Sequence, residues 1–397
     1  MAAPGRTAPR LAFSRPRSAL RDAAPALLGY SAARVVGLLM AWVYGQSHDR
    51  STLQRLGTFW DAGWYVRIVE HGYSVTDGFI GAHGIPYSPR AFFPLFPWLA
   101  KGLRTVLPVS PGTALVLVSS VAGLVAAWGV YAVCRLCHGR RAGVLAAVLW
   151  GTLPLALLEN TAYSEALFTA VAAWTLYAVL SRRWILAGIM CVVAGLIRPT
   201  AMALTAAVGV AAVVEIYRCL HGRGRIHWSR PLVGGMLSPV GWVGYMLYVG
   251  WVEGSWGAYF HIQQAWASGF DGGWSTLKWF GRLLFDQQSS TGIPLSDAVM
   301  AMTLAGYLVL FAITLVHRQP PVLMVYSAAL LVIDLGNASP YPPLARFLMP
   351  AFTLLLPLAA SLARLRSRGT LAVILGAAAL LSGLYGVFVL FLGSAPS

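Results

Sequence analysis

The run GTALVLVSSVAGLVAAWGVYAVC, Gly112–Cys134, has 23 residues and no charged side chain. A helix of about 20 apolar residues spans the hydrocarbon core of a membrane. Comparable runs recur along the whole chain, which is 58% hydrophobic and 11% charged, whereas soluble domains carry about 25% charged residues. The sequence therefore predicts an all-α, polytopic integral membrane protein, without a polar stretch long enough to form a separate soluble core.

Working outward from this run gives about 11 predicted transmembrane helices. The predicted spans are 24–46, 112–134, 142–157, 163–180, 184–197, 200–217, 231–252, 297–317, 320–336, 347–362 and 370–392. An odd number of spans puts the two termini on opposite sides of the membrane. We expect a basic cytoplasmic tail at 1–23, a single transmembrane domain at 24–392 and a short outer tail at 393–397.

Short clusters of arginines separate the apolar runs and fix the predicted orientation. They comprise Arg15/Arg17/Arg21, Arg135/Arg140/Arg141, Arg182/Arg183, Arg218/Arg223/Arg225/Arg230, Arg318 and Arg364/Arg366/Arg368. Cytoplasmic loops carry such an excess of positive charge, so these clusters predict a cytoplasmic N-terminus. The net charge of +16 is spread over these loops and forms no single patch, and we therefore expect no nucleic-acid partner.

Two large polar loops then fall on the outer side, at about 47–111 and 253–296. Within the first, the segment AFFPLFPWLAKGLRTVL, Ala91–Leu107, combines two prolines with Lys101 and Arg104. This pattern is typical of a helix that lies at the membrane interface rather than crossing it. The first outer loop is therefore predicted to bear interfacial helices.

The acidic residues are distributed unevenly between the two sides. Of the 13 acids, Asp22 and Glu215 fall on the inner side, and the others fall outside or at the outer membrane edge. Acidic residues contribute little to topology, so this asymmetry needs another cause. We interpret it as a sign that the working face is the outer one.

Arg198, in GLIRPTA, lies between apolar stretches that are flanked by predicted cytoplasmic arginines. The chain must cross the membrane twice between these clusters, with Arg198 near the outer boundary and Pro199 breaking the helix. An arginine at this depth is a functional-site hypothesis, facing a cavity. The alternative is that its side chain reaches up to lipid phosphates.

The stretch FWDAGWYVRIVEHGY, Phe59–Tyr73, concentrates chemically capable groups in the first outer loop. Asp61 is a candidate general base, a candidate metal ligand, or the N-cap of the helix that follows. Glu70 and His71 are candidates for metal binding or proton transfer. The aromatic residues suit stacking on sugar rings or a place in the interfacial belt.

Two further segments point to the same outer cavity. In ENTAYSEALF, Glu159–Phe168, the side chains of Glu159, Asn160, Tyr163 and Glu165 either line that cavity or belong to a capped hairpin between two spans. In ARFLMPAF, Ala345–Phe352, Arg346 at the outer edge of a span is suited to an anionic ligand or a lipid headgroup.

The ordered set FWDAGWYVRIVEHGY, AFFPLFPWLAKGL, ENTAYSEALF, AGLIRPTA and ARFLMPAF resembles the PIG-V-type mannosyltransferases. This is the family of GPI mannosyltransferase 2 and its bacterial relatives, within the GT-C glycosyltransferase superfamily. The resemblance runs from about residue 25 to 390. It implies a GT-C-like fold and inverting transfer of a sugar, typically mannose, from a polyprenyl-phosphate-linked donor at the outer face. The chain departs from the paired acidic motif of many GT-C enzymes, because Asp61 is flanked by Trp60 and Ala62.

The resemblance assigns a role to Asp61, and the chemistry of the implied reaction suggests roles for the other candidate residues. Asp61 matches the essential acid of the first outer loop and acts as the base toward an acceptor hydroxyl. Arg198 and Arg346 bind the donor phosphate and neutralise the leaving group. The predicted substrate cavity comprises Trp60, Trp64, Tyr65, Arg67, Glu70, His71, Tyr163 and Glu165. No cofactor follows from the motifs, and a divalent metal is left open by the departure at Asp61.

The expected partners are a polyprenyl-phosphate-linked sugar donor, a lipid or glycan acceptor and membrane lipids, in the inner membrane of a bacterium. A transporter or flippase of lipid-linked glycans is the main alternative, because it shares the spans and the outer polar loops. It requires comparable polar groups on both faces, whereas the inner side here is almost purely basic. The sequence contains no Walker A loop, Rossmann glycine pattern or HExxH motif, which weighs against nucleotide-driven chemistry.

Overall fold

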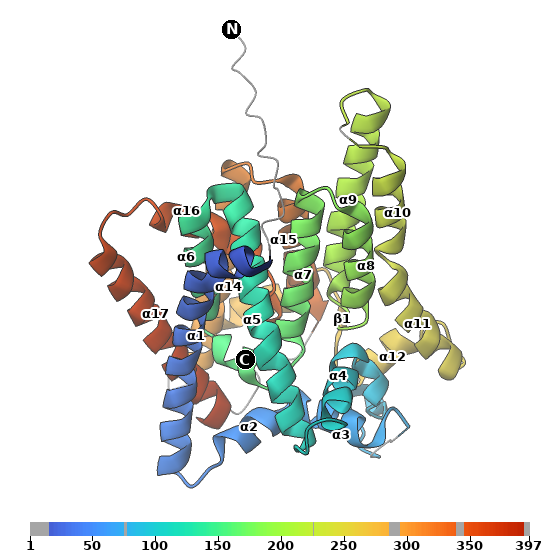
Figure 1. The fold of residues 1–397 in the computed structure, drawn as a ribbon. Helices are drawn as coiled ribbons and strands as arrows, with labels where there is room; N and C mark the ends of the chain where they lie inside the picture. Colours follow the sequence, from blue (N-terminus) through green and yellow to red (C-terminus); the bar gives the residue numbers. More distant parts are fainter. Residues whose placement is uncertain (1–15, 75–77, 225, 286–293, 339–344, 393–397) are drawn as a thin grey trace.

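Helices dominate the computed structural model, which describes residues 16–74, 78–224, 226–285, 294–338 and 345–392 (Figure 1). The longer helices are α1 (Pro16–Ser47), α5 (Pro111–His138), α6 (Arg140–Gly151), α7 (Glu165–Leu180), α8 (Trp184–Gly195), α9 (Ala201–Leu220), α10 (Ser229–Leu237), α11 (Val240–Val252), α14 (Leu295–Val316), α15 (Pro321–Leu335) and α17 (Arg368–Val387). Each predicted span overlaps a helix or a helical pair. The all-α prediction is therefore confirmed.

Short elements connect these helices. They are α2 (Thr52–Thr58), α3 (Asp61–His71), α4 (Leu95–Arg104), α12 (Ala258–Gln264), α13 (Trp274–Phe285) and α16 (Leu356–Leu362), the 3₁₀ turns η1 (Ala82–Gly84), η2 (Pro89–Ala91), η3 (Ala156–Asn160), η4 (Ala345–Leu348) and η5 (Phe352–Leu355), the π turn η6 (Phe388–Leu392), and the strands β1 (Gly269–Phe270) and β2 (Asn337–Ala338). The two strands pair antiparallel, with Gly269 opposite Ala338. This pairing joins the second polar loop to the segment that follows α15.

Six described helices are long and apolar enough to cross a membrane by length and composition. They are Ser18–Ser47, Pro111–His138, Ala201–Leu220, Ser229–Val252, Leu295–Val316 and Arg368–Leu392. Shorter apolar helices cover Glu165–Leu180, Trp184–Gly195, Pro321–Leu335 and Phe352–Leu362. The polytopic character is thus supported, while the number of 11 spans stays a prediction.

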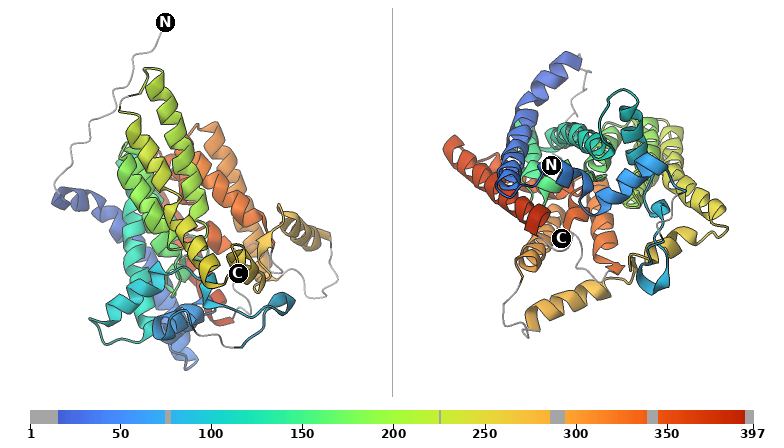
Figure 2. Two further views of the ribbon diagram at one scale, coloured as in Figure 1. Left: turned by 90° about the vertical axis from the view of Figure 1, so that its right-hand side faces the viewer. Right: turned by 90° about the horizontal axis from the view of Figure 1, so that it is seen from below.

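The predicted basic tail at 1–23 stays a prediction, and part of it is helical. Helix α1 begins at Pro16, so residues 16–23 are helical and continue directly into the first predicted span. The remainder of the predicted basic tail, 1–15, and the predicted outer tail, 393–397, lie outside the described residues. Seen from below, α1 and α17 run beside each other at one edge of the bundle (Figure 2).

The helix ends sort into two sets at opposite ends of the bundle. At the arginine-rich end, Arg135 of α5 pairs with Asp22 of α1 at 3.0 Å, and Arg141 of α6 donates to the carbonyl of Leu365 at 2.6 Å. At the other end, Arg55 of α2 donates to the carbonyl of Leu390 at 2.7 Å. The turn η6, which follows α17, therefore meets the first polar loop.

The short helices of the two polar loops gather at this second end, which we call the loop end (lower part of Figure 1). The loops are bonded to each other, because the amide of Ala82 donates to the carbonyl of Ala265 at 2.8 Å. The hydroxyl of Tyr245, on α11, donates to the carbonyl of Phe92 at 2.9 Å. The loops thus form one cap that is fixed to the helical bundle.

Helix α4 corresponds to the segment predicted to lie at the membrane interface. It has 10 residues, so it is about 15 Å long and too short to span a bilayer. Phe96 and Ala100 are buried on one face, whereas Trp98 is exposed on another. Its first residue, Leu95, donates its amide to the carbonyl of Leu196 at 3.0 Å, which ties α4 to the turn that carries Arg198.

Glycines allow α8 to pack directly against the backbone of α10 and α11. A Cβ added at Gly188 would lie 2.7 Å from the carbonyl oxygen of Gly234. Seven residues further along the chain, a Cβ at Gly195 of α8 or at Gly241 of α11 would overlap the backbone of the facing helix. Small residues at such crossings let helices approach closely within membranes. The close approach fixes the position of α8, whose end leads to Arg198.

The substitution Gly241→Ala tests this packing. The new methyl group would overlap the carbonyl of Val192, and overpacking of this kind costs about 1–3 kcal/mol. We expect a lower thermal unfolding midpoint for the detergent-solubilised protein. Gly244→Ala, on the same helix, is the matched control because a Cβ there has no neighbour within 4 Å. An equal loss of stability in both variants would show that helix crossing is not the reason for Gly241.

Candidate active site

The junction between α2 and α3 places Asp61 at the start of a helix. Trp60 adopts φ 46° and ψ −112°, a conformation that is unfavourable for a residue with a side chain and persists only where the surroundings impose it. Trp60 occupies the N-cap position, and no side chain caps the helix there. The alternative in which Asp61 is an N-cap is therefore wrong, and its carboxylate is directed elsewhere.

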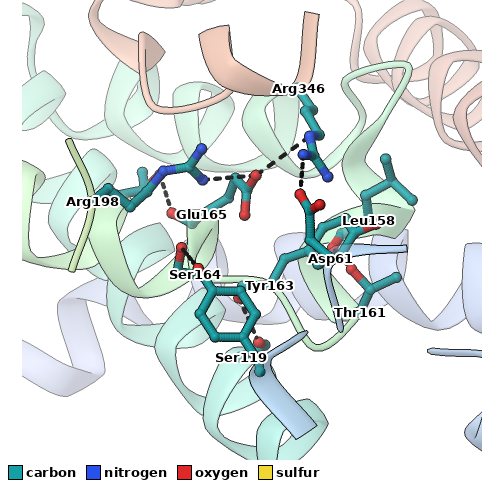
Figure 3. Close-up of polar contacts among 11 residues, drawn as sticks. Asp61, Ser119, Leu158, Thr161, Tyr163, Ser164, Glu165, Arg198 and Arg346 are labelled. Atoms are coloured by element: carbon teal, nitrogen blue, oxygen red, sulfur yellow. Dashed lines mark hydrogen bonds and ion pairs between the residues drawn. The ribbon is translucent and has the colours of Figure 1, made fainter. Parts of the chain in front are cut away.

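That carboxylate belongs to a row of four linked side chains, Asp61, Arg346, Glu165 and Arg198, which we call the charged chain (Figure 3). Asp61 Oδ2 accepts a hydrogen bond from Arg346 Nη2. Arg346 Nε lies 3.8 Å from Glu165 Oε1, and Arg198 Nη1 lies 2.7 Å from the same oxygen. The four residues come from α3, η4, α7 and the turn between α8 and α9. Segments far apart in the sequence thus converge at the loop end, with two acids and two bases.

The four side chains differ in their access to solvent. Those of Arg346, Glu165 and Arg198 are 4%, 6% and 9% exposed, whereas that of Asp61 is 29% exposed. Interactions between charges are stronger in such a water-poor interior than at a surface. Nη1 of Arg346 is buried without a hydrogen-bond partner among the described residues. The charged chain therefore combines an accessible carboxylate with a buried guanidinium whose Nη1 has no hydrogen-bond partner among the described residues.

Aromatic rings hold the two guanidinium groups in place. The guanidinium of Arg346 lies 4.7 Å from the ring centroid of Tyr163 and 4.9 Å from that of Phe347. Phe347 also lies 5.2 Å from the guanidinium of Arg198. Cation–π contacts of this kind are favourable and strengthen when the cation is desolvated. Sequence reasoning did not identify Phe347, although its position beside Arg346 in ARFLMPAF was a usable signal.

Tyr65 lies one turn after Asp61 on α3, on the same face of the helix. It is buried, and its hydroxyl lies 3.0 Å from Ser164 Oγ. Burial raises the pKa of the Tyr65 hydroxyl above its usual value, with smaller opposing effects from Arg198 and from the bond to Ser164. The hydroxyl is thus neutral at physiological pH and fixes α3 against the start of α7. Ser164 was not singled out as a site residue from the sequence.

The segment before α7 is held by a separate set of contacts. Arg34, buried in α1, donates from Nε to Asn160 Oδ1 at 2.9 Å. Ser119 Oγ donates to the carbonyl of Tyr163 at 2.9 Å. Asn160 therefore serves to anchor η3 and does not join the charged chain. These contacts position Tyr163 and Glu165 against Arg346.

Trp64 and Arg67 lie in an aromatic cluster beside the charged chain. The ring of Trp64 lies 5.8 Å from that of Tyr87, 6.0 Å from that of Phe92 and 5.7 Å from that of Trp266. The guanidinium of Arg67 lies 5.0 Å from the Trp64 ring. This cluster connects the two polar loops. Trp60, in contrast, is 45% exposed at the loop end.

The structure does not bring Glu70 and His71 to the charged chain. Both side chains are exposed at the far end of α3, and His71 Nδ1 lies 4.0 Å from Glu70 Oε2. Nine residues of helix place Glu70 about 14 Å from Asp61 along the axis. Within the described ranges, no group of three or more His, Cys, Asp or Glu residues could hold a metal ion.

Asp334, at the end of α15, is a further buried acid that sequence reasoning did not select. Both of its carboxylate oxygens are buried without a hydrogen-bond partner among the described residues. The positive charge of Arg198 interacts electrostatically with the Asp334 carboxylate. A lone acid at the end of an apolar run was the available signal, because ionisable residues within membrane segments usually have a function.

Comparisons with known proteins agree with this architecture. Residues 88–234 match the family model of dolichyl-phosphate-mannose-protein mannosyltransferases. No curated protein matches the chain. The structure is similar to ArnT from Cupriavidus metallidurans bound to undecaprenyl phosphate, with a TM-score of 0.50 and 16% identity over 83% of this chain and 69% of that one.

The chain is also similar to the Archaeoglobus fulgidus oligosaccharyltransferase in its apo form. The TM-score is 0.52 and the identity 14%, over 91% of this chain and 56% of that one. The fold is that of the GT-C membrane glycosyltransferases. The GT-C-like architecture predicted from the ordered motifs is therefore confirmed. The chain spans a little more than half the length of the archaeal enzyme, and the similarity concerns the fold alone.

The substitution Glu165→Ala tests the balance of buried charge in this candidate site. Removing one partner of a buried ion pair costs about 3–5 kcal/mol, because the remaining charge is left uncompensated. We expect a clear fall in the free energy of unfolding, measured by denaturation in detergent. Glu70→Ala is the control, since an exposed acid at the surface contributes within about 0.5 kcal/mol.

The double variant Glu165→Ala/Arg198→Ala completes the cycle. Because it removes one acid and one base, we expect it to lose less stability than the sum of the two single variants. Additive losses would contradict the pairing of Glu165 with Arg198.

Proposed function

We propose that this protein is a glycosyltransferase that moves mannose from a polyprenyl-phosphate-linked donor to an acceptor hydroxyl at the extracytoplasmic face of a membrane. The observation that carries the proposal is the chain Asp61–Arg346–Glu165–Arg198. It combines one accessible carboxylate with two buried guanidiniums at the end of the molecule where the polar loops gather. A base and an anion-binding pair within one small volume suit transfer of a glycosyl group from a phosphate.

The convergence of separate motifs supports the assignment to the PIG-V branch. Asp61, Glu165, Arg198 and Arg346 belong to four of the five motifs that carry the resemblance. The fifth, AFFPLFPWLAKGL, contacts the Arg198 turn through the bond from Leu95 to Leu196. The matched family model covers the three central motifs. Segments that share only an order in the sequence therefore share a place in the structure.

In the proposed reaction, Asp61 takes the proton from the acceptor hydroxyl, and the resulting oxygen attacks the anomeric carbon. The bond from this carbon to the phosphate oxygen breaks, and its electron pair leaves with the lipid phosphate. Attack from the side opposite the leaving group inverts the anomeric centre. Tyr163 and Tyr65, together with the aromatic side chains of α3, would bound the space for the sugar.

The two arginines act on the leaving phosphate, and Arg346 does so while its Nη2 stays bonded to Asp61. Nη1 of Arg346 is buried and has no protein partner in the described chain, so a phosphate oxygen would satisfy it. As the bond breaks, negative charge grows on that phosphate, and preorganised cations stabilise it. Glu165 holds Arg198 and Arg346 near each other before the donor arrives.

The setting we propose is the inner membrane of a bacterium, with the N-terminus in the cytoplasm and the site on the outer face. This orientation follows from the arginine clusters, which the positive-inside rule assigns to the cytoplasm. A lipid-linked donor suits an apolar chain of this kind, because its carrier stays within the membrane. The donor, the acceptor hydroxyl and membrane lipids are then the partners of the protein.

The variant Asp61→Asn is expected to lower sugar transfer by about 10²–10⁴-fold, the usual contribution of a general base. The assay supplies purified protein in detergent with radiolabelled polyprenyl-phosphate-mannose and a membrane extract as the source of acceptor. Glu70→Gln is the control, because Glu70 lies on the same helix but away from the charged chain. Asp61→Glu, which keeps a carboxylate, separates lost chemistry from a lost fold.

Equal transfer by the wild type and Asp61→Asn would remove Asp61 from the centre of the reaction. Absence of transfer from mannose, glucose and arabinose donors by a folded wild-type protein would favour the transporter alternative.

Arg346→Lys tests the binding of the leaving group. Lysine keeps the positive charge but lacks the planar fork, so it cannot present two donors to Asp61 and a phosphate oxygen in the fixed geometry of the guanidinium. We expect kcat to fall by about 10²-fold, the usual effect of removing one stabilising donor. Arg366→Lys, exposed at the arginine-rich end, should leave transfer unchanged. Unaltered kcat in Arg346→Lys would exclude a role for the guanidinium in the transition state.

A further inference from the structure

A cavity of about 600 Å³ lies at the arginine-rich end, far from Asp61. It is formed by the last turns of α9, the turn between α7 and α8, and the loop that follows α9 (upper right of Figure 1). Its lining includes Arg182, Val213, Glu215, Tyr217, Arg218 and Arg223. The cavity thus combines three arginines with apolar side chains, and the proposed transfer reaction uses none of them.

Glu215 organises two of the three arginines. Its carboxylate is buried, with Oε1 2.8 Å from Arg182 Nη1 and Oε2 3.8 Å from Arg218 Nη1. One carboxylate therefore holds two guanidiniums beside each other and reduces their mutual repulsion. Arg223 adds a third positive charge and has no ion-pair partner in the part of the chain that the structure describes. The cavity keeps an excess of positive charge, as a site for an anion requires.

The backbone around Arg182 is also fixed. Arg182 has φ 60°, in the left-handed region that residues with a side chain rarely adopt. The amide of Arg182 donates to the carbonyl of Val179, and that of Arg183 donates to the carbonyl of Ala178, both within hydrogen-bond distance. The turn therefore holds the Arg182 side chain in a defined direction, toward Glu215.

The apolar wall of the cavity belongs to a helix that is long enough to cross a membrane. Val213 and Tyr217 are 67% and 59% exposed on α9, one turn apart. On such a helix, exposed apolar side chains face lipid. The cavity therefore adjoins both a headgroup region, marked by the arginines, and an acyl-chain region, marked by Val213 and Tyr217.

We propose that this cavity binds the phosphate of an anionic membrane lipid, with Arg182, Arg218 and Arg223 around the phosphate and the acyl chains along Val213 and Tyr217. Guanidiniums bind phosphate oxygens through paired hydrogen bonds, and basic pockets between helices suit anionic headgroups. The site lies at the opposite end of the bundle from the charged chain, so it does not depend on the proposed reaction.

Native mass spectrometry of the detergent-solubilised protein tests this site, with phosphatidylglycerol as the probe and phosphatidylcholine as the neutral comparison. The variant is Arg218→Ala/Arg223→Ala, because both side chains are exposed and their loss spares the ion pair of Arg182 with the buried carboxylate of Glu215. Each arginine near an anionic headgroup contributes about fivefold in affinity, so the double variant should bind phosphatidylglycerol about 25-fold more weakly.

The matched control is Arg364→Ala/Arg366→Ala, which removes the same charge at the same end of the molecule. It should bind phosphatidylglycerol like the wild type. Equal weakening in both double variants, or equal binding of phosphatidylcholine by the wild type, would overturn the proposal. An unchanged affinity in Arg218→Ala/Arg223→Ala would overturn it as well.

Competition with inorganic phosphate and glycerol phosphate separates two sources of the same chemistry. Retention of the lipid against these soluble anions supports a lipid headgroup as the ligand. Displacement by them supports the phosphate site and assigns it to a soluble phosphate ester. Asp61→Asn should bind phosphatidylglycerol like the wild type, so failure of this site and failure of the proposed reaction give different results.

Discussion

The ion pairs of Glu165 are the constraint on which the loop end depends. Arg198 and Arg346 are both buried, and a buried guanidinium without a counter-charge is strongly destabilising. Among the residues that the structure describes, Glu165, at the first position of α7, is the one acid within ion-pair distance of both. Its position requires α7 to begin where the α8–α9 turn and η4 converge. The charge balance thus fixes the relative placement of three segments.

The cap formed by the polar loops completes this arrangement. Asp61 adds the fourth charge, so the set is neutral as a whole, and its partial exposure leaves the carboxylate accessible. The unfavourable backbone conformation of Trp60 is the local cost of directing Asp61 toward Arg346. That conformation persists because the cap is bonded to the bundle on several sides, including the bond from Arg55 to the end of the last helix. Local strain and tertiary packing therefore support each other.

The sequence was sufficient to place the helices and to bring the site residues to one end. Uncharged runs identify membrane segments regardless of packing, and the arginine clusters assign their ends, so Asp61, Arg198 and Arg346 could be grouped. The ion pairs among these side chains could not be predicted from the sequence, because contacts between α3, α7 and η4 depend on how the helices cross. The same limit explains why Glu70 and His71 were grouped with Asp61 from the sequence. They share its helix, but their side chains are exposed at the far end of that helix, away from the charged chain.

The arrangement of polarity along the bundle distinguishes the two classes of function considered. A transporter needs polar groups along a path that opens alternately to both sides. Between the charged chain and the arginine-rich end lies an apolar core of small and branched side chains from α5, α6, α7, α9 and α15. Helix α8 contacts α10 and α11 backbone to backbone, so rocking of these helices would break dense packing. A charged chain at one end, with Asp61 partly exposed and a packed core behind it, fits the proposed one-sided transferase better than a transporter.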